Sequence, residues 1–150
     1  MVGNNITINE GETSTFTVEL NSEPLDTVTI TLNVDTALIP ILGNPPPAGR
    51  VNITPAPDGS NNISLTFTPS GATAWNVPQT ITIEAIDNSI IDGDVTNEPI
   101  SFTVTSNDGN YNNLSISDVQ VTVRDNDNAN IDFSKNLIIV SETGWEDLSL

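Results

Sequence analysis

Hydrophobic and polar residues alternate along much of the chain with a period of two. The clearest runs cover residues 16–20 and 28–34, where apolar side chains alternate with threonine and other polar residues. Because successive side chains of a β-strand point to opposite faces, this alternation predicts strands with one buried face. Similar runs lie at 6–8, 65–67, 81–83, 100–104 and 119–123. No window of the sequence shows the periodicity of a helix.

Turn-forming residues separate the predicted strands. The chain contains nine glycines and ten prolines, and these residue types favour turns. Short strands with one apolar face, connected by turns, pack well as two sheets face to face. The sequence therefore predicts an all-β fold, a two-sheet antiparallel β-sandwich that is immunoglobulin-like and has about seven strands.

Two insertions interrupt the strand pattern after residue 36. Residues 37–49 include three consecutive prolines at 45–47, which cannot donate to the ladder of an inner strand. Residues 55–62 form a second break that is rich in turn residues. We interpret 50–54 and 63–69 as one strand path bent by this second break, and the placement of the acidic residues depends on this interpretation.

The end of the chain repeats a pattern from its beginning. The segment Ile138-Ile139-Val140-Ser141-Glu142 resembles Ile6-Thr7-Ile8-Asn9-Glu10, at a distance of about 130 residues. A period of this length indicates tandem domains. We predict a sandwich repeat at residues 1–128, followed at 129–150 by a linker and the truncated start of the next repeat. Any export signal is expected to lie outside the chain.

The chain is strongly acidic. Twenty acidic residues face only Arg50, Arg124 and Lys135, which gives a formal net charge of −17. Such a chain repels phosphate groups, which disfavours binding to nucleic acid or to an anionic membrane surface. No stretch is long and apolar enough for membrane insertion. Two explanations of the acidity stay open: the solubility of an exposed surface, or the binding of cations.

Cysteine and histidine are both absent from the sequence. Their absence excludes thiol nucleophiles, Ser-His-Asp triads, and zinc, copper or haem sites with nitrogen or sulfur ligands. Sites made of oxygen ligands, chiefly calcium sites, remain. A chain without cysteine also fits a secreted or cell-surface protein of bacterial type.

A catalytic function is not expected. Glycoside hydrolysis uses two carboxylates in a cleft, and Asp92 and Glu98 are the pair to consider. Both are predicted on a loop, and aromatic residues that could hold a sugar are scarce. We therefore expect that the protein is not an enzyme.

The predicted order of strands brings four acidic groups to one end of the sandwich. Because each strand reverses the direction of the one before, alternate connections lie at the same end. Converging carboxylates repel one another unless a cation neutralises them, so this end is a candidate calcium site of weak affinity. If 50–54 and 63–69 were separate antiparallel strands, the groups would divide between the two ends. The four groups are Glu10 with Glu12; Asp35; Asp87 with Asp92, Asp94 and Glu98; and Asp125 with Asp127.

Several short segments together form a recognisable pattern. They are the turn Asn9-Glu10-Gly11, the stretch Trp75-Asn76-Val77-Pro78-Gln79, and the closing run Val123-Arg124-Asp125-Asn126-Asp127. In these segments the chain resembles the Calx-β domain family, in particular the tandem type found in bacterial surface proteins. The resemblance covers residues 4–128 and implies a calcium-binding sandwich. The ligand positions that it implies are Glu10, Asp35, Asp87, Asp92, Asp94, Glu98, Asp125 and Asp127.

These observations lead to one functional hypothesis and two alternatives. The hypothesis is a calcium-binding structural or adhesive repeat of a large extracellular protein, monomeric, whose ion stiffens the junction with the neighbouring repeat. A cell-surface protein or a glycan is a further expected partner. The first alternative is a carbohydrate-binding, lectin-like module that uses Trp75 and Tyr111 for ring stacking. The second is a spacer repeat that does not need calcium.

Overall fold

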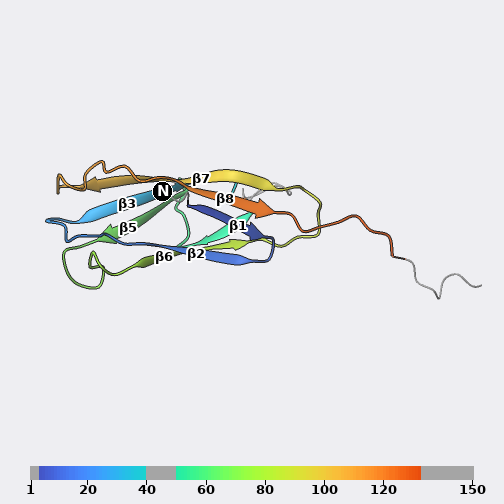
Figure 1. The fold of residues 1–150 in the computed structure, drawn as a ribbon, viewed down its shortest axis with the longest axis horizontal. Helices are drawn as coiled ribbons and strands as arrows, with labels where there is room; N and C mark the ends of the chain where they lie inside the picture. Colours follow the sequence, from blue (N-terminus) through green and yellow to red (C-terminus); the bar gives the residue numbers. More distant parts are fainter. Residues whose placement is uncertain (1–3, 40–49, 133–150) are drawn as a thin grey trace, which may run out of the picture.

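The computed structural model describes residues 4–39 and 50–132, which form eight strands in two facing sheets and contain no helix (Figure 1). This confirms the predicted all-β sandwich. The strand count is one higher than expected because the bent path consists of two strands. The strands are β1 (Asn5–Asn9), β2 (Thr13–Val18), β3 (Val28–Val34), β4 (Val51–Thr54), β5 (Asn62–Phe67), β6 (Gln79–Ala85), β7 (Val95–Ser106) and β8 (Val119–Arg124).

The two sheets differ in size. The larger has the order β1-β8-β7-β3-β5, and the smaller has the order β2-β6-β4. All neighbouring strands are antiparallel except the first and last of the described residues, β1 and β8, which pair in parallel with Ile6 opposite Val121. The predicted antiparallel arrangement therefore holds except at this edge, where the pairing is parallel. The reason is that both strands end at the same end of the sandwich and lie side by side.

The chain changes sheets between β4 and β5 without changing direction. β4 is antiparallel to β6 in the small sheet, whereas β5 is antiparallel to β3 in the large one. The turn between them is organised by Asp58, whose carboxylate accepts the N–H groups of Ser60 and Asn62. The prediction of one bent strand is therefore wrong, because β4 and β5 are separate strands. Their common direction is as predicted, and the predicted position of the acidic residues depends on this direction.

As a result, β1, β6 and β8 all end at one end of the sandwich, which we call the exit pole. β3 runs in the same direction but ends at Val34, opposite Ile100 and level with the start of β8, so the prediction that Asp35 lies at this end is wrong. The turn after β1 fixes this arrangement, since Glu10 N–H donates to the carbonyl of Arg124 and Gly11 N–H donates to that of Ala85. Figure 1 shows that the chain leaves the domain on this side. The loops β2–β3, β5–β6 and β7–β8 lie at the other end, the far pole.

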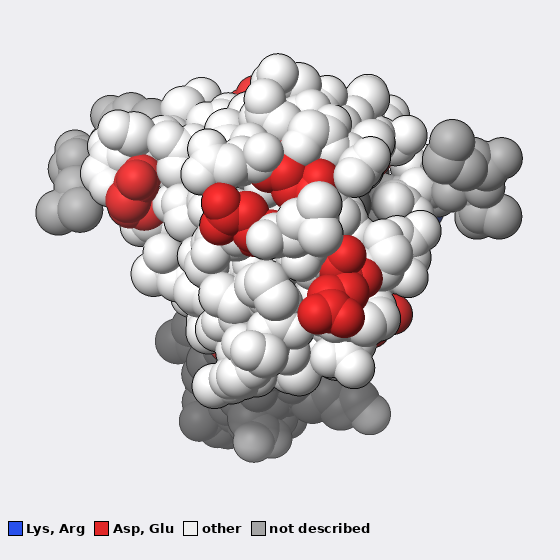
Figure 2. All heavy atoms as spheres, turned by 90° about the vertical axis from the view of Figure 1, so that its left-hand side faces the viewer, with Lys and Arg blue, Asp and Glu red and all other residues white. Residues whose placement is uncertain are grey.

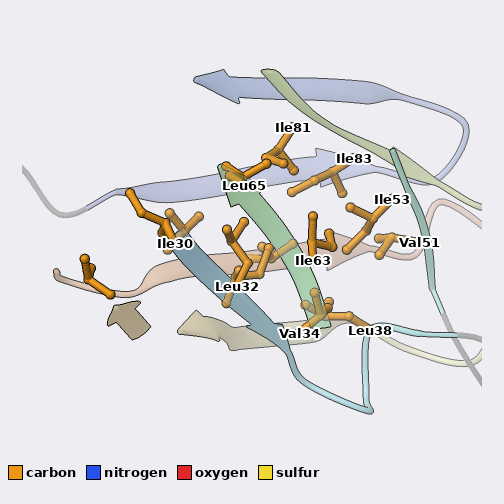
Figure 3. Close-up of a cluster of buried hydrophobic side chains, with 14 of the residues drawn as sticks. Ile30, Leu32, Val34, Leu38, Val51, Ile53, Ile63, Leu65, Ile81 and Ile83 are labelled. Atoms are coloured by element: carbon orange, nitrogen blue, oxygen red, sulfur yellow. The ribbon is translucent and has the colours of Figure 1, made fainter. Parts of the chain in front are cut away.

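The core lies between the sheets and consists of the alternating apolar positions that the sequence predicts (Figure 3). Leu32 and Phe67 from the large sheet, and Ile81 and Ile83 from the small one, are fully buried. Leu38, which follows β3, is also fully buried. Burial of side chains of this size stabilises the fold by about 1.5–3 kcal/mol each.

At the far pole, acidic side chains form hydrogen bonds with the backbone of the loops. The Asp108 carboxylate accepts the backbone N–H groups of Leu25 and Asn110, and so joins the β2–β3 and β7–β8 loops. The hydrogen bonds from Leu25 and then Asn110 hold the pKa of Asp108 below its ordinary value. Figure 2, which faces this pole, shows acidic side chains in separate patches. These carboxylates do not form one cluster, and Asp108 already has its donors.

Leu32 and Leu25 form a matched pair that tests the assigned core. We expect Leu32→Ala to lower the free energy of unfolding by about 2–5 kcal/mol, because truncation of a fully buried leucine leaves a cavity. Leu25 is 85% exposed, so Leu25→Ala should change it by less than about 0.5 kcal/mol. Urea denaturation followed by tryptophan fluorescence measures both values. Equal losses in the two variants would contradict the core assignment.

The pKa of Asp108 predicts how stability depends on pH. Because the folded-state pKa is lower than the unfolded value of about 3.9, the ionised carboxylate stabilises the fold above pH about 4. This contribution is lost as the pH falls through the folded-state pKa. Asp108→Asn should therefore lower the melting temperature at pH 7, with a difference from the parent that shrinks below pH 4. The control is Asp118→Asn at an exposed position, and a pH-independent difference for Asp108→Asn would contradict the prediction.

Candidate metal centre

Three segments meet at the exit pole: the turn after β1, the β6–β7 loop, and the segment that follows β8. Gly11, in the first of these segments, has a φ of +80°, which is unfavourable for other residues. It lies beside Asp87 of the second segment, where a Cβ atom at Gly11 would be at an ordinary contact distance of 3.6 Å from Cβ of Asp87. The neighbouring residue, Glu10, has its side chain inside the protein, where the whole residue is only 3% exposed.

Carboxylate oxygens of Glu10, Asp125 and Asp127 lie within 4.8 Å of one another. Glu10 Oε2 and Asp127 Oδ2 are buried and have no hydrogen-bond partner among the described residues. Burial raises the pKa of Glu10, and the negative charges of Asp92 and Asp125 raise it further, with partial compensation from Arg50. Oxygens without donors in a negatively charged cluster are a suitable environment for a cation.

Asp125 joins the β6–β7 loop to the segment after β8. Its Oδ2 accepts the N–H groups of Asp92 and Gly93 at 2.7 and 2.6 Å, and its Oδ1 accepts that of Asp127 at 2.8 Å. In return, the N–H of Asp125 donates to Asp94 Oδ1 at 3.0 Å. These hydrogen bonds, that from Asp127 first and that from Gly93 next, lower the pKa of Asp125. The pKa of Asp125 is therefore shifted down, whereas that of the neighbouring Glu10 is shifted up.

One buried cation of the chain already lies beside this cluster. Arg50, directly before β4, is 4% exposed, and its Nη1 lies 2.8 Å from Asp92 Oδ1 and 3.6 Å from Glu10 Oε1. The sequence reasoning assigned no role to Arg50. Its signal in the sequence was weak: it is one of three basic residues in an acidic chain, placed immediately before a buried strand.

Two asparagine amides complete the surroundings of Glu10. Asn126 Nδ2 donates to the backbone carbonyl of Glu10 at 3.1 Å, and Asn88 Nδ2 donates to Glu10 Oε1 at 3.0 Å. The sequence reasoning assigned no function to either residue. An aspartate at position 126 would lack the donor that ties the departing segment to the turn after β1.

The structure brings together three of the eight predicted ligands, Glu10, Asp125 and Asp127, and places Asp92 beside them through Arg50. As ligands, all eight remain predictions. Asp94 is exposed and bound to the backbone of Asp125, while Asp87 is exposed beside Gly11. These two residues border the cluster of three carboxylates rather than belong to it.

Asp35 and Glu98 serve other local structures. Asp35 follows β3, and its Oδ1 accepts the N–H of Ala37 in a turn. Glu98 was expected in the β6–β7 loop but lies within β7, opposite Val121. The loop is shorter than predicted because a bulge between Val95 and Glu98 lets β7 begin earlier.

The two aromatic residues considered for sugar stacking are part of the structure of the far pole. Tyr111 is 7% exposed, and its hydroxyl donates to the carbonyl of Ser22 at 2.6 Å. Its ring is therefore largely covered by the protein. Trp75 is half-buried and packs against the core, and its backbone N–H donates to the carbonyl of Thr68.

Comparisons with known proteins give no match, whether with family models, curated proteins or solved structures. The resemblance to the Calx-β family thus rests on the residues quoted above. The segment at residues 138–142, from which a second repeat is predicted, lies outside the described residues. Nothing in the described part of the chain forms a helix that could span a membrane.

Proposed function

We propose that this domain binds one calcium ion at the exit pole, between Glu10, Asp125 and Asp127, and serves as a structural repeat of a longer extracellular protein. The observation that carries the proposal is the Glu10 carboxylate. It is buried within 4.8 Å of two further carboxylates, and its Oε2 has no partner among the described residues. A divalent cation supplies the missing charge and coordination in one step.

The type of donor favours calcium over other metals. All three groups offer oxygen, and the chain contains no histidine or cysteine. Calcium takes six to eight oxygen ligands in flexible geometry, which suits a site assembled from a turn and a departing segment. Magnesium requires a stricter octahedron and keeps more of its water, so it fits this cluster less well.

The position of the cluster connects ion binding to the geometry of the chain. Asp125 and Asp127 belong to the segment that leaves the domain, whereas Glu10 belongs to its first turn. An ion held by all three fastens the departing segment to the body of the sandwich. Figure 1 shows that this segment continues away from the domain beyond the exit pole. Calcium would therefore fix the direction in which a following repeat begins, which is a structural role and not a catalytic one.

Calcium titration with matched variants tests the site. Calorimetry should detect one ion per parent chain, with binding weakened at least about tenfold by Glu10→Gln or Asp127→Asn. The reason is that a charge contact at about 4 Å is worth more than the 1.4 kcal/mol of a tenfold change. The controls Glu23→Gln and Asp118→Asn make the same chemical changes at exposed positions. Both control variants should bind calcium like the parent. Absence of heat in the parent protein would refute the site and leave the role of a calcium-independent spacer.

Hydrogen exchange tests the structural consequence of binding. Calcium should slow the exchange of backbone amides at residues 125–127, because the ion holds the departing segment on the turn after β1. Amides in β3, at the centre of the large sheet, should change less and provide the internal reference. Calcium binding without added protection at 125–127 would separate ion binding from the proposed role at the junction.

A further inference from the structure

The guanidinium group of Arg50 lies inside a shell of oxygen atoms. Nη1 is close to two carboxylates, at 2.8 Å from Asp92 Oδ1 and 3.6 Å from Glu10 Oε1. Nη2 donates to two backbone carbonyls, those of Gly93 at 2.9 Å and Asp92 at 3.3 Å. Carboxylates combined with backbone carbonyls are the ligand types that calcium prefers. Arg50 thus occupies a position whose surroundings resemble those of a metal ion.

Water has little access to the charged groups in this shell. The side chains of Arg50, Glu10 and Asp92 are 5%, 0% and 6% exposed. The contact between Nη1 and Asp92 Oδ1 lacks the alignment of a hydrogen bond, and neither Asp92 oxygen has such a partner in the described part of the chain. Asp92 therefore depends on the charge of Arg50, because removal of one partner leaves a buried charge uncompensated.

Glu10 is shared between this shell and the candidate metal centre. Arg50 and Asn88 both approach its Oε1. Its Oε2 has no partner among the described residues and is free for an ion held with Asp125 and Asp127. The exit pole consequently offers two neighbouring positions for a cation, one of which the chain fills itself.

We propose that Arg50 is a built-in cation that takes the place of a second divalent ion. It neutralises Glu10 and Asp92 from within the chain, so the domain folds without metal and the exit pole accepts a single ion. The limit of one ion rests on the proposed function, whereas the role of Arg50 in folding without metal does not.

The test compares Arg50→Met with Arg124→Met, which removes the same charge from an exposed position just before Asp125. Native mass spectrometry in calcium should detect one ion on the parent and on Arg124→Met, but two on Arg50→Met. In EDTA, Arg50→Met should melt about 10 °C or more below Arg124→Met, because two buried carboxylates lose their counterion. Millimolar calcium should raise the melting temperature of Arg50→Met and so remove most of this difference.

Arg50→Lys provides a second variant that is expected to fold, since lysine keeps the charge. It should bind one ion, and two ions on this variant would overturn the proposal. So would a second ion on the parent, a single ion on Arg50→Met, or failure of Arg50→Met to fold in calcium. Equal melting of Arg50→Met and Arg124→Met in EDTA would overturn the role in folding. A parent protein that binds no calcium would refute the proposed function, and the comparison in EDTA would still decide the role of Arg50.

Discussion

The structure of the exit pole depends on which groups compensate the negative charge of one buried carboxylate, that of Glu10. Glu10 lies in a turn that its own N–H and that of Gly11 hold against β8 and β6, and its side chain is fully buried. A carboxylate in a fixed, buried position needs hydrogen-bond donors or cations, and its desolvation is costly without them. Arg50 and Asn88 provide compensation on the side of Oε1. The remaining oxygen, together with the charges of Asp125 and Asp127, creates the requirement that a calcium ion would meet.

The direction of the strands, more than their exact pairing, gathers these charges. The parallel pairing of β1 with β8 places the first turn beside the departing segment, and the hydrogen bond from Gly11 N–H to the carbonyl of Ala85 brings the end of β6 to the same place. The change of sheet between β4 and β5 preserves this arrangement because both strands run the same way. A reversal at Asp58 would have moved every later connection to the other end.

Much of the fold is predictable from the sequence because alternation reports burial directly: every second residue from Val28 to Val34 is buried as expected. The common pole of Glu10, Asp92 and Asp125 is also predictable, since it follows from a count of chain reversals. The details of the site are not predictable in this way. Around Arg50 they involve Gly93, a residue with a φ of +78° whose carbonyl accepts from the guanidinium and whose N–H donates to Asp125. Likewise, the place of Glu98 depends on a bulge in β7 that no alternation pattern marks.

The two ends of the sandwich show why acidity alone does not identify a cation site. At the far pole, Asp108 accepts backbone N–H groups that the loops must in any case satisfy, and its pKa falls. At the exit pole, Glu10 is buried among other negative charges with an oxygen that lacks a donor, and its pKa rises. Both residues are buried and acidic, yet one already has its hydrogen-bond partners while the other does not. The unsatisfied oxygen, and not the net charge of −17, is therefore the property that distinguishes the exit pole as a place for a metal ion.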